Sequence, residues 1–195
     1  MHDMSETQGI IVFGANGSGK TTLGRELARI LKFKHMDIED YCFEKSEIPY
    51  TQLRSREEFL ELMLVDIKKY HSFVISTVIG DLGDIIPEFY QLAVYLSAPF
   101  ELRMERVKQR SYEQYGERVL QGGDMYEQEQ KFFDFVASRS LSKIDRWAET
   151  LTCPVVNVDG TLDWRMNASN IANYFMGLTG GTNPAKCGCE IDNLL

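Results

Sequence analysis

The chain has 195 residues, 44% of them hydrophobic, and its 21 basic and 29 acidic side chains give a formal net charge of −8. These values fit one soluble globular domain with a substantial core, and an acidic balance without a basic cluster argues against nucleic-acid binding. No apolar run reaches the roughly 18 residues of a membrane span, so we expect no membrane contact. The polar segment Met1–Gln8 also lacks the hydrophobic core of a signal peptide.

The first expected strand, Ile10–Phe13, leads into a glycine-rich run, and the helical pattern of Lys20–Leu31 follows. Residues 14–21 match G-x-x-x-x-G-K-[ST] without a mismatch, in the strand–turn–helix context that this motif requires. An ordinary strand–turn–helix corner is the alternative, but the motif and its context agree. The sequence therefore predicts a phosphate-binding loop built from Gly14, Asn16, Gly17, Ser18, Gly19, Lys20, Thr21 and Thr22.

Each part of this loop has a physical task in binding a nucleotide. The glycines let successive backbone N–H groups turn inward as an anion-binding nest, and the helix N-terminus adds partial positive charge. Lys20 is predicted to reach the β- and γ-phosphates of ATP, and the hydroxyl of Thr21 is predicted to bind Mg²⁺.

The second expected strand, Phe33–Met36, ends in the acidic run Asp37-Ile38-Glu39-Asp40. Ligands of open parallel sheets lie beyond the carboxyl ends of the strands, so we expect Asp37 to touch metal-bound water or the acceptor hydroxyl. If extended backbone continues, Asp37 and Glu39 share one side and Asp40 points away. A solvated loop start is the alternative interpretation of these carboxylates.

An arginine, Arg54, stands just before the helical pattern of Arg56–Tyr70. A guanidinium at this place can clamp a phosphate or carboxylate of an acceptor with two hydrogen bonds, and an exposed surface charge is the alternative. The third expected strand, Phe73–Thr77, runs into Gly80 and Asp81 rather than into the acidic pair typical of ATPase motors. An Asn-Lys-x-Asp sequence for guanine recognition is also absent, which argues against a GTPase.

The fourth expected strand, Leu92–Leu96, is followed by a helix from Phe100 to about Tyr115, which begins after a proline. Arg103, Arg106 and Arg110 recur at three- and four-residue spacing and so share one helical face. Pairing with glutamates of the same helix is the alternative use of these arginines.

A glycine-hinged segment follows this helix and indicates a lid over about residues 111–130. Gly116, Gly122 and Gly123 allow bending, and Arg118 lies between them. Such a lid excludes water and brings positive charge to a transferring phosphoryl group. Arg110 and Arg118 are therefore predicted to be catalytic.

The remaining chain predicts a long helical stretch, Met125–Thr150, with a break near Ser138–Ser140. A fifth strand, Val155–Val158, and a closing helix, Asp163–Leu178, follow, and residues 179–195 are expected to form a mobile tail beyond one domain of residues 1–178. Alternation of strands and helices predicts a three-layer α/β fold with a five-stranded parallel sheet. The scattered cysteines indicate free thiols in a reducing cytoplasm; they are Cys42, Cys153, Cys187 and Cys189.

With these motifs in place, the chain resembles the small P-loop kinases of the nucleoside-monophosphate kinase and shikimate kinase type, over Ile10 to about Phe175. It is also similar to bacterial kinases or ATPases of unassigned substrate. In these kinases the loop after the last strand cradles adenine, which implies that role for Asp159, Gly160 and Thr161. Shikimate kinases have a glycine triplet after strand three, of which Gly80 remains here, so the resemblance implies that Gly80 contributes to acceptor binding. No familiar acceptor pocket is reproduced as a whole.

The expected function is an ATP-dependent phosphotransferase acting on a small-molecule acceptor with ATP and Mg²⁺. Lys20, Asp37, Arg110 and Arg118 are the expected catalytic residues, with Asp37, Arg54 and Gly80 at the acceptor. The alternative is a nucleotide-dependent switch that hydrolyses ATP slowly. The sequence leaves the acceptor and the oligomeric state open.

Overall fold

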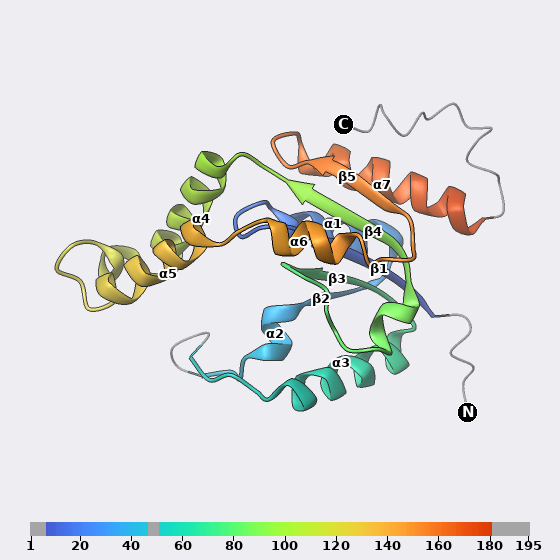
Figure 1. The fold of residues 1–195 in the computed structure, drawn as a ribbon, viewed down its shortest axis with the longest axis horizontal. Helices are drawn as coiled ribbons and strands as arrows, with labels where there is room; N and C mark the ends of the chain where they lie inside the picture. Colours follow the sequence, from blue (N-terminus) through green and yellow to red (C-terminus); the bar gives the residue numbers. More distant parts are fainter. Residues whose placement is uncertain (1–6, 47–50, 181–195) are drawn as a thin grey trace.

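A computed structural model of the chain describes residues 7–46 and 51–180. Its centre is a sheet of five parallel strands in the order β2-β3-β1-β4-β5 (Figure 1). The predicted three-layer α/β fold with this sheet is confirmed, and each strand lies within about two residues of its expected bounds. The strands are β1 Gln8–Phe13, β2 Lys34–Asp37, β3 Ser72–Thr77, β4 Tyr90–Ser97 and β5 Val155–Asp159.

Helices cover both faces of the sheet. One face packs against α1 and α7, and the opposite face packs against α3 and α6. The helices are α1 Lys20–Leu31, α2 Ile38–Cys42, α3 Arg56–Tyr70, α4 Phe100–Tyr115, α5 Tyr126–Ser138, α6 Ser142–Ala148 and α7 Trp164–Thr179, with short 3₁₀ turns η2 Ile86–Phe89 and η3 Gly116–Val119. None of the described helices has the length and apolar character needed to cross a membrane.

The central strand β1 shows why the core forms on both faces. Ile10 and Val12 are fully buried among side chains of α1 and α7, whereas Ile11 and Phe13 are fully buried on the α3 and α6 side. Successive side chains of a strand point to opposite faces, and a strand buried on both faces is apolar throughout. Each such side chain contributes roughly 1.5–3 kcal/mol through burial. The core therefore anchors the strand that leads into the phosphate loop.

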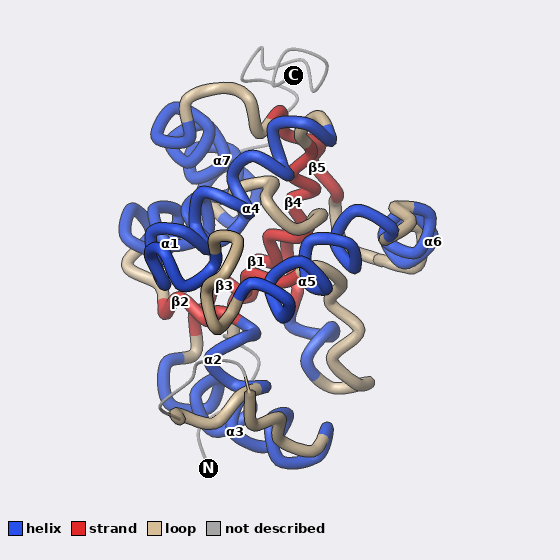
Figure 2. The backbone as a smooth tube through the Cα atoms, turned by 90° about the vertical axis from the view of Figure 1, so that its left-hand side faces the viewer, coloured by secondary structure: helices blue, strands red, loops and turns tan. Residues whose placement is uncertain are grey.

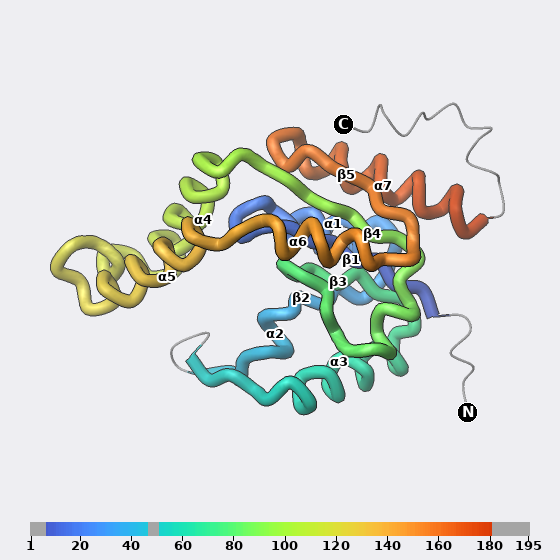
Figure 3. The backbone as a smooth tube through the Cα atoms, viewed as in Figure 1, coloured from blue at the N-terminus to red at the C-terminus, as the bar shows by residue number. Residues whose placement is uncertain are grey.

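Helices α4 and α5 form a hairpin that extends away from the sheet (Figure 3). Its own small core, around Val107, Phe133 and Val136, is separate from the two cores of the sheet. Figure 2 looks onto the hairpin and the end of the sheet from which β4 runs into α4. The hairpin thus stands over the carboxyl ends of the strands, where ligands of parallel sheets bind.

The backbone after β2 differs from the expected extended exit. Helix α2 begins at Ile38, and the Asp37 side chain accepts a hydrogen bond from the backbone N–H of Glu39 at 3.2 Å. An aspartate is a favoured N-cap because its carboxylate satisfies an N–H of the first helical turn. The extended backbone on which the alternation of Asp37 and Glu39 depended therefore does not continue beyond Asp37.

The predicted break in the long helical stretch is confirmed and lies between α5 and α6. Helix α5 ends at Ser138 and α6 begins at Ser142. The closing helix α7 includes Thr179, which the sequence had placed in the tail. Residues 181–195, with Cys187 and Cys189, lie outside the described part of the chain.

Candidate nucleotide and acceptor site

The phosphate loop joins β1 to α1 and takes backbone conformations that only glycine adopts readily. Gly17 has φ +79° and Gly19, the N-cap of α1, has φ +100°. A Cβ atom at Gly17 would also collide with the backbone oxygen of Arg103 at the start of α4. The glycines thus serve both the left-handed backbone and the close approach of α4.

A cavity of about 540 Å³ lies over this loop. Lys20, Thr21 and Thr22 line it from α1, Arg106 and Arg110 line it from α4, and Gly160, Trp164 and Asn167 line it beyond β5. Its volume is in the range of small-molecule and cofactor sites. The structure therefore gathers the loop and the α4 arginines around one nucleotide-sized space.

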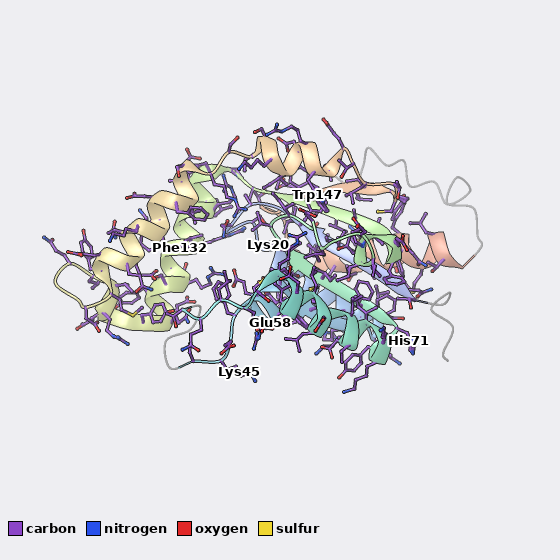
Figure 4. All side chains as sticks on the ribbon, turned by 60° about the horizontal axis from the view of Figure 1, so that its bottom comes forward. Lys20, Lys45, Glu58, His71, Phe132 and Trp147 are labelled. Carbon is purple, nitrogen blue, oxygen red and sulfur yellow. The ribbon has the colours of Figure 1, made fainter. Side chains whose placement is uncertain are left out.

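The side chain of Lys20 is half-buried at the end of the sheet that faces the α4–α5 hairpin, which carries Phe132 (Figure 4). Burial lowers the pKa of Lys20 to about 8, although Glu39 and Asp37 act in the opposite direction. Arg110 and Arg139 also lower this pKa. Three cations, Lys20, Arg110 and Arg139, thus lie close together beside the loop with two carboxylates, Asp37 and Glu39, and the excess of positive charge favours an anionic ligand.

A hydrogen-bonded chain fixes the first turn of α1 to the sheet. The hydroxyl of Ser76 on β3 donates to the carbonyl oxygen of Lys20 at 3.1 Å, and Nε2 of His35 on β2 lies 2.9 Å from the same hydroxyl. Because the one hydroxyl proton goes to Lys20, His35 must donate through Nε2. Burial lowers the pKa of His35, in keeping with a neutral ring.

Two arginines of α4 brace the loop rather than pairing with glutamates of their own helix. Arg103 donates to the carbonyl oxygens of Ala98 and Asn16 at 3.1 and 3.4 Å. Arg106 donates to the carbonyl oxygens of Ser18 and Gly160 at 3.3 and 3.0 Å. Of the three predicted arginines, Arg110 is the one whose side chain makes no such bond within the described chain and faces the cavity.

Arg139 is a candidate that sequence reasoning missed. It lies in the break between α5 and α6, and its guanidinium donates to Oδ1 of Asn16 at 3.4 Å. It is also close enough to lower the pKa of Lys20. The predicted break near Ser138–Ser140 marked the position as a loop, but no local pattern distinguished this arginine from a surface charge.

The loop after β5 brings one of its three predicted residues to the cavity. Gly160 lines the cavity, and its N–H donates to the carbonyl oxygen of Ser97 at 2.7 Å. Asp159 accepts from the N–H of Thr161 at 2.8 Å and so forms the turn beside Gly160. Trp164 and Asn167, which the sequence did not single out, also line the cavity from α7.

A second cavity of about 240 Å³ lies between α2, α4 and α5. Arg110 lines this cavity as well as the first. Glu39, at the start of α2, lines the second cavity but not the first. Burial, together with the charge of Asp37, raises the pKa of Glu39. Glu39 and Arg110 thus lie where the cavity over the phosphate loop meets the smaller cavity.

Arg54 and Gly80, both assigned to acceptor binding, do not line either cavity. Arg54 donates to the carbonyl oxygen of Tyr41 at 2.8 Å and to that of Phe43, because the end of α2 leaves these carbonyls without helical partners. Gly80 is buried, and a Cβ there would collide with Ile11 and lie 2.8 Å from the Trp147 ring. Both residues thus make local structural contacts away from the two cavities.

Arg118, predicted to be catalytic, also stays away from both cavities. It pairs with Asp124 at 2.8 Å, and both side chains are more than half exposed. The turn between α4 and α5 brings these two residues together at the tip of the hairpin. Catalysis by Arg118 would require this ion pair to break.

Comparison with known proteins agrees with the fold and the phosphate loop. A family model described as the AAA domain matches residues 10–131. An uncharacterized protein of Bacillus subtilis strain 168, YqaC, is 27% identical over 173 residues, which are 85% of this chain and 96% of that protein. A shikimate kinase of Enterococcus faecalis is 26% identical over 159 residues, 74% of this chain and 94% of that enzyme.

Among solved structures, shikimate kinase from Acinetobacter baumannii in complex with shikimate superposes with a TM-score of 0.54 at 19% identity. The superposition covers 91% of this chain and 96% of that one, and at this identity it shows a common fold. The family match spans more than half of the chain and includes the loop, Lys20 and Arg110. The chain therefore belongs to the AAA domain family and has the fold of the P-loop kinases.

Proposed function

We propose that the chain is a phosphotransferase that moves the γ-phosphoryl group of Mg-ATP to a hydroxyl of a small-molecule acceptor. The observation that carries the proposal is the pair of cavities that share Arg110, one over the phosphate loop and one beside Glu39. A kinase must hold two substrates on either side of the transferring group. A switch that only hydrolyses ATP needs no second cavity.

The ATP side is assigned to groups that the larger cavity exposes. Backbone N–H groups of the loop hold the phosphates, and Gly160, with the turn made by Asp159 and Thr161, holds the adenine side. Lys20 and Arg110 offset negative charge as it shifts during transfer. Cations that meet the charge developing on the bridging oxygen stabilise the transition state more than the ground state.

The residues beside the loop also fit Mg²⁺. A hydroxyl from Thr21 and a carboxylate from Asp37 are hard oxygen donors, and Mg²⁺ in kinases is held by one or two such groups together with phosphates. The described residues contain no cluster of three or more His, Cys, Asp or Glu side chains placed to hold a metal ion. When bound, the ion neutralises phosphate charge.

On the acceptor side, Glu39 is the proposed general base. Its carboxylate takes the proton of the acceptor hydroxyl while that oxygen bonds to the γ-phosphorus and the bond from γ-phosphorus to the bridging β–γ oxygen breaks, leaving ADP. Burial raises the pKa of Glu39, and a base with a raised pKa accepts a proton more readily. Asp37, fixed as the N-cap of α2, serves the metal side.

An acceptor screen tests the proposal. Purified protein is incubated with Mg-ATP and with nucleosides, nucleotides and hydroxy-metabolites, while ADP, free phosphate and phosphorylated products are measured separately. A phosphorylated product that forms in step with ADP supports the proposal. Release of free phosphate at the same rate with every compound would instead establish the slow ATP hydrolysis of a switch.

Arg110 and Arg118 should differ when each is replaced by alanine. Arg110→Ala is expected to lower kcat by about tenfold or more with little change in ATP affinity, because Arg110 already lines both cavities. Arg118→Ala should lower kcat only if the lid closes and breaks the pair with Asp124. Steady-state kinetics on both variants and on Asp124→Ala decide this. Equal, near-normal rates in all three would contradict a catalytic role for both arginines.

ATP binding should take up protons near pH 8 because Lys20 has a pKa of about 8 in the free protein. The phosphates of bound ATP raise this pKa, so at pH 8 binding should take up about half a proton, and affinity should fall as pH rises further. Calorimetry in two buffers of different ionisation enthalpy measures the uptake. The variant Lys20→Met should show none, and a wild-type enthalpy that does not depend on the buffer would contradict the expected titration.

A further inference from the structure

The second cavity, called the acceptor cavity from here on, has an unusual balance of charge for a site that receives a phosphoryl group. Its described lining contains two carboxylates, Glu39 and Glu129, and one cation, Arg110. Arg110 also lines the nucleotide cavity, where ATP would engage its charge. The lining that remains for an acceptor is negative.

The other arginines near this region are committed elsewhere. Arg54 donates to the carbonyl oxygens of Tyr41 and Phe43, and Arg139 donates to Asn16 of the phosphate loop. Neither side chain lines the acceptor cavity. Within the described chain, the cavity therefore has no cation reserved for a carboxylate or phosphate of an acceptor.

Glu129 on α5 is the more informative of the two carboxylates. It is 7% exposed, and its Oε2 atom accepts a hydrogen bond from the hydroxyl of Ser111 at 2.5 Å. Its Oε1 atom has no hydrogen-bond partner among the described residues, although Glu129 lines the cavity. Oε1 is not one of the fully buried atoms that lack a partner, so it is open toward the cavity, where its free acceptor capacity favours a ligand that donates a hydrogen bond or carries positive charge.

Flat and polar neutral groups complete the lining. Three rings, those of Phe43, Tyr115 and Phe132, offer apolar faces, and the carboxamides of Gln114 and Gln128 can both donate and accept hydrogen bonds. This combination suits a ring compound with N–H or O–H groups. It offers little to an anion, which two carboxylates would repel in a half-buried space.

We propose that the phosphate acceptor is an uncharged or cationic ring compound with hydroxyl and N–H donors, an inference that rests on the proposed function. Acceptors that carry a carboxylate or phosphate are rejected. Glu129 and Glu39 provide the discrimination by repelling anions, and Glu129 also accepts a hydrogen bond from the ligand. The aromatic rings supply the contact area. The acceptor cavity thereby differs in charge preference from a site for shikimate, which is a carboxylate.

Matched pairs of probes test this charge preference without requiring turnover. The pairs are adenosine with adenosine 5′-monophosphate, and methyl shikimate with shikimate, each measured by calorimetry on the protein filled with Mg²⁺ and a non-hydrolysable ATP analogue. The uncharged member of at least one pair is expected to bind at least about tenfold more tightly than its anion. Tighter binding of the anions, or no binding by either uncharged probe, would overturn the inference.

Two variants test whether side chains of the acceptor cavity cause the preference for uncharged probes. Glu129→Gln should narrow the ratio between uncharged and anionic probes, whereas general damage to the fold would weaken both alike. Gln114→Lys, at an exposed position of α4, adds a cation to the lining and should strengthen binding of the anions about tenfold. The exposed Glu127 gives a control, Glu127→Gln, with an unchanged ratio. An unchanged ratio in both lining variants would contradict the assignment.

The two proposals can fail separately. A neutral probe that binds and responds to Glu129→Gln, but is not phosphorylated with Mg-ATP, would support the charge preference and contradict the kinase function for that acceptor class. An anion that is phosphorylated efficiently would support the kinase function and overturn the charge preference.

Discussion

Replacing Lys20 with alanine is expected to lower phosphoryl transfer by on the order of a hundredfold or more. Lys20 lines the nucleotide cavity at the head of α1, where the Ser76 hydroxyl holds its backbone carbonyl. In the proposed reaction, its ammonium group stabilises the γ-phosphoryl group as this group leaves ADP. No other side chain of the loop is cationic, so nothing in the loop can replace it.

The fold should survive this substitution. Burial lowers the pKa of Lys20 to about 8, which means that charging this side chain costs more free energy in the native protein without nucleotide than in the unfolded chain. At pH 7 that cost is on the order of a few kcal/mol, so the alanine variant should melt no lower than the wild type. Turnover and thermal melting are measured together, with Lys143→Ala on the exposed face of α6 as control. Near-normal turnover in Lys20→Ala would remove its catalytic assignment.

The phosphate loop was predictable from sequence because its information is local. Strand β1, the glycines and the first turn of α1 are adjacent in the chain, and the spacing of Gly17 and Gly19 follows from the backbone angles that the loop requires. Strands β1 and β3 were also predictable, because each is a short apolar run, buried on both faces, between turn or polar residues. The loop and these strands could be predicted without knowing which elements pack against each other in the folded chain.

The cavity that we propose for the acceptor was not predictable in the same way, since it is assembled from distant segments. The position of Glu39 depends on the N-cap that Asp37 forms for α2, which was not predicted from the sequence. Glu129 and Phe132 are ordinary members of an amphipathic helix until α5 folds back on α4. Side-chain use also depends on tertiary neighbours. Arg54 and Arg103 each donate to backbone carbonyl oxygens, and nothing in the sequence around either arginine indicates these partners, because only the folded chain brings them into place.

The two carboxylates after β2 should separate into distinct roles when each loses its charge. Asp37→Asn keeps a side chain that can cap α2 and is expected to weaken the response of ATP binding to Mg²⁺, because asparagine is a poorer ligand for that ion. Transfer should fall as well, by on the order of a hundredfold, if Asp37 holds metal-bound water beside the phosphates. Titration of ATP binding with and without Mg²⁺ measures the first effect.

Glu39→Gln should lower transfer to the acceptor by on the order of a hundredfold while Mg-ATP binds within a few-fold of wild type. Glutamine has nearly the same shape, so it still lines the acceptor cavity, but it cannot take the hydroxyl proton. Glu44→Gln makes the same chemical change at an exposed position five residues later and should leave kcat unchanged. A base with a raised pKa should make the wild-type rate of transfer rise with pH, and Glu39→Gln should lose this rise. A pH profile of kcat for the three proteins, with calorimetry of ATP binding, checks both effects. If Glu39→Gln keeps the wild-type rate and pH profile, the acceptor proton must leave by another route.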